Sequence, residues 1–118
     1  MREEDYGRGI ELFNRGEFYE AHEVLEDVWR PSGQPERRFL QGLIQVAVAL
    51  HHHSQGNVVG ARSLLARARR NLNLYPPAFG GIELADLRNA LELWQQALDS
   101  GSELPPAPQL RMLKSQLP

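Results

Sequence analysis

Apolar residues recur at helical spacing through five segments of the chain, and glycines and prolines separate these segments. A spacing of three or four residues places side chains on one face of an α-helix, whereas a half-buried strand requires strict alternation. The pattern therefore predicts an all-α fold, a compact bundle of about five helices arranged as antiparallel hairpins. The separating residues are Gly16, Gly33, Gly56, Gly80, Gly81 and the prolines at 31, 35, 76, 77, 105, 106 and 108.

The five segments predict helices over about residues 4–15, 17–30, 35–55, 57–74 and 83–100. The third is the most apolar, and aliphatic residues cover more than half of its circumference, which is typical of a central helix. No strand is predicted, and residues 75–77 are interpreted as a rigid connection. We divide the chain into a single all-α domain over residues 1–100 and a proline-rich tail over residues 101–118, which we expect to be extended or disordered.

A weak internal repeat appears when the sequence is shifted by 40 residues. Each copy contains a helix, a glycine turn and a second helix, as in tetratricopeptide-type hairpins, whose usual period is about 34 residues. We favour shared hairpin geometry over a true repeat protein, because any antiparallel helix pair requires a turn and a small residue near it. The matched pairs are Gly16 with Gly56, Ala21 with Ala61, and Leu25 with Leu65.

Composition excludes several classes of protein. The 118 residues include no cysteine, which excludes a disulfide framework, a zinc ribbon, an iron–sulfur site and a cysteine nucleophile. The 15 acidic and 13 basic side chains give a net charge of -2, so the whole chain offers no electrostatic case for nucleic-acid binding. No apolar run is long enough to cross a bilayer, and the first five residues are too charged for a secretory signal, so we expect a cytoplasmic protein.

The densest polar cluster lies in the second expected helix. His22 and Glu26 are four residues apart, so they share one face, at the edge of the apolar stripe and next to Trp29. Such a pair is able to hold two positions on a metal or to act as an oriented base, and it resembles half of the H-E-x-x-H metalloprotease signature. The alternative, which we favour, is that His22 forms local hydrogen bonds and Glu26 pairs with an arginine from another helix.

The third expected helix supplies the natural partners. Arg38 is expected to need a carboxylate, from Glu23 or Glu26, and is then either a structural ion pair or an anion-binding arginine. His51 is expected on the opposite, apolar side, shielded from water. The three consecutive histidines at 51–53 point in directions about 100° apart, so they cannot form one ligand set. The residues expected on the narrow polar face are Arg38, Gln41, Gln45 and His52.

The fourth expected helix carries the only basic patch, which comprises Arg62, Arg67, Arg69 and Arg70. It is able to meet a phosphate backbone, but no aromatic residue is interleaved for base stacking. We favour a solvated face, or pairing with the acidic second helix.

The stretches Phe18–Trp29 and Arg37–His51 resemble the domain-of-unknown-function family numbered 309, and the likeness extends over roughly residues 6–98. The resemblance implies a compact all-helical domain of bacteria, archaea and plastid-bearing plants, with no established activity. The family pattern falls here on His22, Glu23, Glu26, Trp29, Arg38, Gln41, Gly42 and His51.

Three functions remain open at this point. The first and favoured one is a non-catalytic binding or interaction module with a groove between the second and third helices, and its candidate binding residues are Trp29, Arg38, Gln41 and Gln45. The second is a small hydrolase-type enzyme with a metal or anion site. Its catalytic candidates are His22, Glu23, Glu26 and Arg38, and its candidate metal ligands are His22, Glu26 and His51. The third is nucleic-acid contact through the arginine-rich helix.

The expected partners follow from these functions. A protein partner or a small anionic ligand fits the first two, nucleic acid is disfavoured, and no membrane is involved. A divalent metal is compatible with the sequence but not required by it, and a homo-oligomer is compatible as well.

Overall fold

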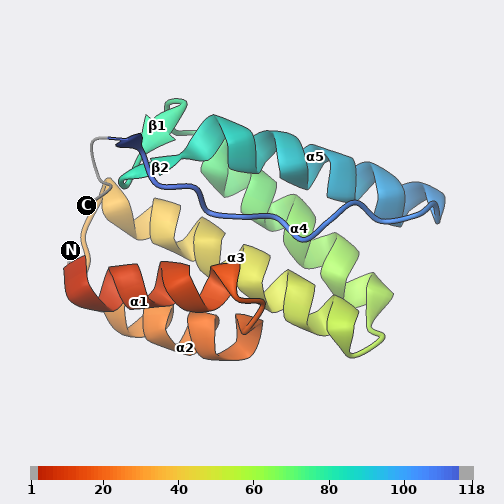
Figure 1. Cartoon of the computed structure of the whole chain (residues 1–118), viewed down its shortest axis with the longest axis horizontal. Coiled ribbons are helices and arrows are strands. Elements are labelled where there is room, and N and C mark those ends of the chain that lie inside the picture. The colour runs from red at the N-terminus through yellow and green to blue at the C-terminus, as the bar shows by residue number, and fades with distance from the viewer. Residues whose placement is uncertain (1–2, 115–118) are drawn as a thin grey trace.

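The computed structural model describes residues 3–114, which form five α-helices and one two-stranded sheet (Figure 1). The all-α prediction is confirmed, and each helix begins and ends within two residues of the predicted boundary. Within residues 3–114, no helix has the length and hydropathy that crossing a membrane requires. The elements in chain order are α1 (Glu3–Asn14), α2 (Phe18–Trp29), α3 (Glu36–Ser54), α4 (Val58–Leu72), β1 (Ala78–Phe79), β2 (Ile82–Glu83) and α5 (Leu84–Ser100).

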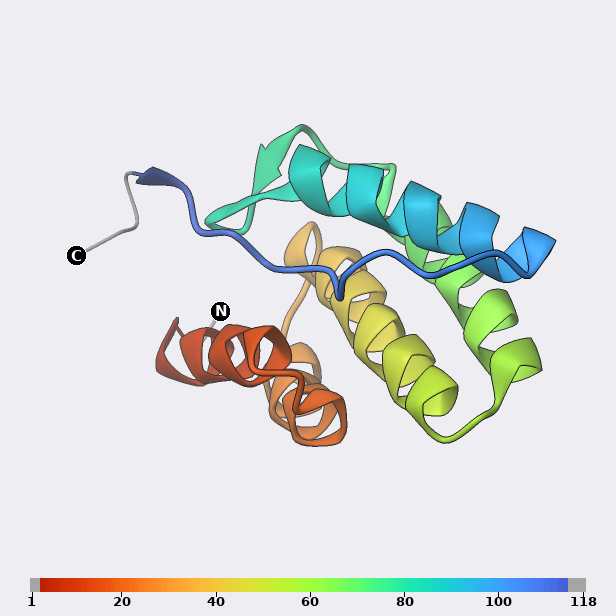
Figure 2. The same ribbon diagram turned by 45° about the vertical axis from the view of Figure 1, so that its right-hand side comes forward.

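Helix α3 lies at the centre of the molecule. It packs against α2 on one side and α4 on the other, while α1 adjoins α2 and α5 adjoins α4 (Figures 1 and 2). Its aliphatic arc supplies much of the core, because side chains on several of its faces are removed from water. The fully buried side chains of α3 are Phe39, Leu40, Leu43, Val46 and Ala47.

The α1–α2 and α3–α4 hairpins turn in the same way. Gly16 and Gly56 both have φ +80°, a conformation that favours glycine. Glu17 N–H donates to Leu12 O at 3.0 Å, and Asn57 N–H donates to His52 O at 2.9 Å, which is the Schellman pattern at a helix C-terminus. The 40-residue likeness in the sequence therefore corresponds to two helices that end with the same hydrogen bonds.

A short hairpin between α4 and α5 is absent from the sequence prediction. Strands β1 and β2 pair antiparallel, with Ala78 opposite Glu83 and Phe79 opposite Ile82. Two-residue strands are too short for alternation to be visible in the sequence. The Tyr6 hydroxyl on α1 donates to the Gly80 carbonyl at 2.6 Å, and its burial raises the pKa of that hydroxyl. The hairpin thus ties the start of α1 to the start of α5.

The C-terminal strap, which we define as residues 102–114, runs in extended form across α5 toward α1 (Figure 2). The Trp94 indole N–H donates to Pro106 O at 2.9 Å, and Asn14 both donates to Leu110 O (3.0 Å) and accepts from Leu110 N (2.7 Å). Leu110 is 1% exposed and joins the hydrophobic core, a role that its position in the proline-rich tail did not predict. Residues 115–118 of that tail lie outside the described residues.

Candidate functional site

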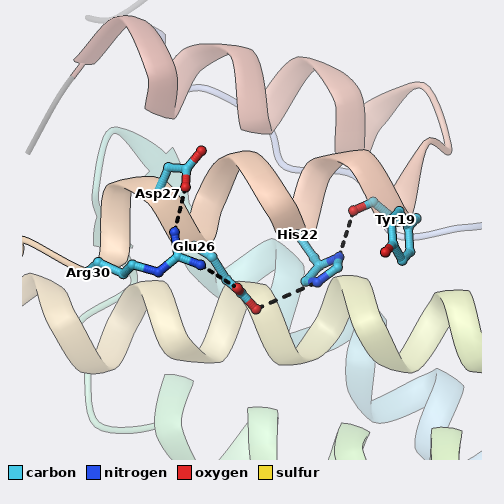
Figure 3. Close-up of polar contacts among 5 residues, drawn as sticks. All are labelled: Tyr19, His22, Glu26, Asp27 and Arg30. Atoms are coloured by element: carbon cyan, nitrogen blue, oxygen red, sulfur yellow. Dashed lines mark hydrogen bonds and ion pairs between the residues drawn. The ribbon is translucent and has the colours of Figure 1, made fainter.

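The polar row of α2 is built from contacts within that helix (Figure 3). His22 Nδ1 lies 2.6 Å from Tyr19 O, and because a carbonyl only accepts, Nδ1 is the donor. The other ring nitrogen, Nε2, lies 3.6 Å from Glu26 Oε1. Both ring nitrogens therefore face oxygen atoms of the same helix, and these contacts set the orientation of the imidazole.

Glu26 pairs with an arginine of its own helix. Its Oε2 lies 3.4 Å from Arg30 Nη2, and Arg30 Nη1 donates to Asp27 Oδ1 at 2.7 Å (Figure 3). The prediction that Glu26 pairs with an arginine from another helix is wrong, because the four-residue spacing places Arg30 beside Glu26 on α2 itself. The carboxylate is thus partly neutralised by a neighbouring guanidinium.

Arg38 is exposed, and its side chain forms no ion pair within residues 3–114, so its predicted pairing with an α2 carboxylate is wrong. Its neighbour Arg37 faces α2 instead. Arg37 Nη1 donates to the main-chain carbonyls of Trp29 (3.0 Å), Arg30 (3.2 Å) and Ser32 (3.2 Å). Its guanidinium also lies 4.0 Å from the Trp29 ring centroid, a cation–π distance. Every helix leaves carbonyls without a helical partner at its C-terminus, and these carbonyls could have indicated that a nearby arginine would donate to them.

The predicted binding residues do not line one groove between α2 and α3. Trp29 is covered by Arg37, and Gln41 is exposed on α3. Gln45 accepts a hydrogen bond from Asn71 Nδ2 on α4 at 2.8 Å, so it belongs to the α3–α4 contact. The residues predicted to form one polar cluster between the second and third helices are therefore divided between the α2–α3 contact and the α3–α4 contact.

A cluster of three aromatic rings joins α2 to α3. The Tyr19 ring lies 5.0 Å from the His22 ring and 5.3 Å from the His51 ring, centroid to centroid. His51 is half-exposed beside this tyrosine, not shielded on an apolar face as expected. His53 turns elsewhere and packs edge-on against Trp94 of α5 at 5.4 Å. Tyr19 was missed as a site residue, although it lies three residues before His22 and thus on the same face.

The candidate metal ligands do not form one donor set. Across residues 3–114, no group of three or more histidine and carboxylate side chains is placed to hold a metal ion. His22, Glu26 and His51 are not brought into such a group, because Glu26 turns toward Arg30 and His22, while the His51 ring packs against Tyr19.

Arg62 of the basic patch on α4 pairs with α5, whereas Arg67 is exposed. Arg62 Nε lies 3.1 Å from Asp99 Oδ1, an ion pair between the two helices. The expected pairing with the acidic second helix is not formed, because α3 lies between α2 and α4 (Figure 2).

Comparison with known proteins identifies relatives with similar sequences. The chain is 37% identical over 81 residues to an uncharacterized protein of Aquifex aeolicus, which covers 68% of this chain and 24% of the relative. It is 35% identical over 91 residues to the uncharacterized protein YpuF of Bacillus subtilis, which covers 76% of this chain and 52% of that protein. The chain thus spans about a quarter and about half of the lengths of these two relatives. The family model described as "Domain of unknown function (DUF309)" matches residues 6–64, half of the chain, and the chain belongs to this family.

Proposed function

We propose that this domain is a non-catalytic helical interaction module. It binds a basic protein partner through the ring cluster of Tyr19, His22 and His51 and through the exposed carboxylates beside that cluster.

The observation that carries the proposal is the environment of Tyr19. Its side chain is 48% exposed, yet its ring packs against His22 of the same helix and His51 of α3. Tyrosine is enriched among the residues that dominate the energy of protein interfaces. A ring already held in place by its neighbours loses little conformational entropy when a partner covers it.

The charge beside Tyr19 defines the kind of partner. Glu20 and Glu23 are exposed and lie on the same side of α2, three residues apart. Neither forms an ion pair within residues 3–114, unlike Glu26 and Asp27, which both pair with Arg30. A partner segment with lysine or arginine side chains would pair with these free carboxylates and place a cation against the Tyr19 ring.

Two further findings support a binding role. The matched region forms only a part of both longer relatives, as is common for a unit that is combined with other segments. Glu26, one of the catalytic candidates, is engaged with Arg30, so it is not free to act as a base without giving up that contact.

Site-specific photocrosslinking in the native host tests the proposal. A benzophenone-bearing phenylalanine replaces Tyr19 in one version of the chain and Leu93, which is 56% exposed on α5, in the matched control. We expect a discrete adduct to a basic protein from position 19 that is absent from position 93. Charge reversal by Glu20→Lys with Glu23→Lys should reduce this adduct by about tenfold, whereas Glu92→Lys on α5 should leave it unchanged.

Either of two results would contradict this function. The first is an identical adduct pattern from positions 19 and 93. The second is a position-19 adduct that survives reversal of both α2 carboxylates while the variant remains folded by circular dichroism.

A further inference from the structure

An open, arginine-lined hollow of about 620 Å³ lies between α4 and α5, on elements that take no part in the ring cluster. Three arginines and one carboxylate line it, which gives a formal charge of +2. Helix α4 contains no acidic residue, so its own side chains do not compensate this charge. The polar residues of the hollow that matter here are Arg62, Ser63, Arg69, Arg70, Gln95 and Asp99.

The charges in the hollow are unevenly paired. Asp99 Oδ1 accepts from Arg62 Nε (3.1 Å) and from Gln95 Nε2 (3.3 Å). The only carboxylate that lines the hollow within residues 3–114 is therefore engaged at the end where Arg62 lies. Arg69 and Arg70 lie in the last turn of α4, roughly 10 Å farther along the helix. The macrodipole favours cations at that position, so both arginines are tolerated without a carboxylate. Among the described residues neither forms an ion pair, and their guanidiniums remain available to an anion.

Gln95 supplies a second and independent observation. This side chain is only 8% exposed, and its Nε2 donates to Arg62 O (3.3 Å) and to Asp99 Oδ1 (3.3 Å). Its Oε1 is buried and has no hydrogen-bond donor among the residues described. Buried acceptors are normally satisfied, and this one belongs to a side chain in the wall of the hollow. The oxygen is closed off from water as the side chain lies, and a ligand hydroxyl would satisfy it once the side chain turns toward the hollow.

We infer that this hollow binds a small phosphorylated polyol, such as a sugar phosphate. The phosphate would lie against Arg69 and Arg70, whose planar guanidiniums match phosphate oxygens in bidentate geometry. A ligand hydroxyl would donate to Gln95 Oε1, with Ser63 beside it. Among the residues that the structure describes, no aromatic side chain lines the hollow, so the site lacks the stacking platform of a nucleobase site. This inference does not depend on the proposed partner surface of α2.

Isothermal titration calorimetry of the full chain tests the inference with glycerol 3-phosphate, ribose 5-phosphate and glucose 6-phosphate as ligands. At least one is expected to bind about tenfold more tightly than inorganic phosphate and than its own unphosphorylated polyol. Arg69→Ala with Arg70→Ala should weaken that binding by about tenfold or more. The matched control is Arg67→Ala, which changes an exposed α4 arginine outside the hollow and should alter affinity by less than about twofold.

Gln95→Leu tests the hydroxyl contact separately. It should leave the affinity for inorganic phosphate unchanged and remove the preference for the phosphorylated polyol. Thermal unfolding of each variant verifies that it is folded. The inference would be overturned if none of the three ligands binds, if inorganic phosphate binds as tightly as all of them, or if Arg67→Ala weakens binding as much as the double variant.

Discussion

Arg37 and Arg38 are adjacent in sequence but have different environments. Arg37 covers the Trp29 ring and donates to three main-chain carbonyls at and after the end of α2, whereas Arg38 is exposed on α3. Sequence reasoning selected Arg38, because helical periodicity placed it on a polar face of the third helix. Which of two adjacent arginines reaches α2 depends on the path of the chain through residues 30–35. The apolar periodicity of a single helix does not predict the path of the segment that connects it to the helix before it.

This difference predicts unequal effects on stability. Arg37→Ala should lower the free energy of unfolding by about 1–3 kcal/mol, because it leaves the carbonyls of the α2 terminus without their charged donor. Arg38→Ala should change it by less than about 0.5 kcal/mol, as is usual for an exposed side chain. Urea denaturation of both variants makes the comparison, and equal losses of stability would contradict the assigned roles.

The sequence predicts the helices, but it does not predict where two helices approach each other most closely. The five helices follow from apolar periodicity, and a glycine turn joins the two helices of the α1–α2 hairpin and of the α3–α4 hairpin as expected. Gly42, in contrast, lies inside α3, where a Cβ atom would come within 2.7 Å of Leu72 Cδ2 on α4. Such a close approach depends on how two helices cross. The strap was likewise hidden from the sequence, because Asn14 and Leu110 meet across 96 residues of chain.

Two glycine substitutions test this packing. Gly42→Ala should lower the free energy of unfolding by about 1–2 kcal/mol, because the overlap of the added methyl group with a buried leucine outweighs the gain of about 1 kcal/mol in helix propensity. Gly7 lies on the exposed face of α1, where no other part of the described chain beyond the adjoining helix backbone comes within 4 Å of an added Cβ. Gly7→Ala should raise the free energy of unfolding by up to about 1 kcal/mol through helix propensity. Thermal unfolding reports both changes, and shifts of the same sign in the two variants would show that α3 and α4 do not approach as described.

The whole molecule presents two surfaces of opposite charge on the two sides of α3. Helix α2 lies on one side of α3, and α4 and α5 lie on the other (Figure 2). The α2 side carries the ring cluster and the exposed Glu20 and Glu23, and the arginine-lined hollow lies between α4 and α5. The near-neutral composition of the chain conceals this separation. Both sets of charged residues could be located in the sequence. Their pairing was one of two expectations for the basic patch, and it is not formed because α3 lies between α2 and α4.

We propose that His22 belongs to a binding surface and that it does not form a metal-dependent catalytic centre with Glu26. The most direct test of this claim is metal analysis of the tag-free chain after incubation with Zn²⁺ or Mn²⁺ and gel filtration, alongside the His22→Ala variant. The arrangement of Tyr19, His22, Glu26 and Arg30 predicts far less than about one ion per chain and no change on substitution. A stoichiometric ion that the His22→Ala variant loses would contradict the account.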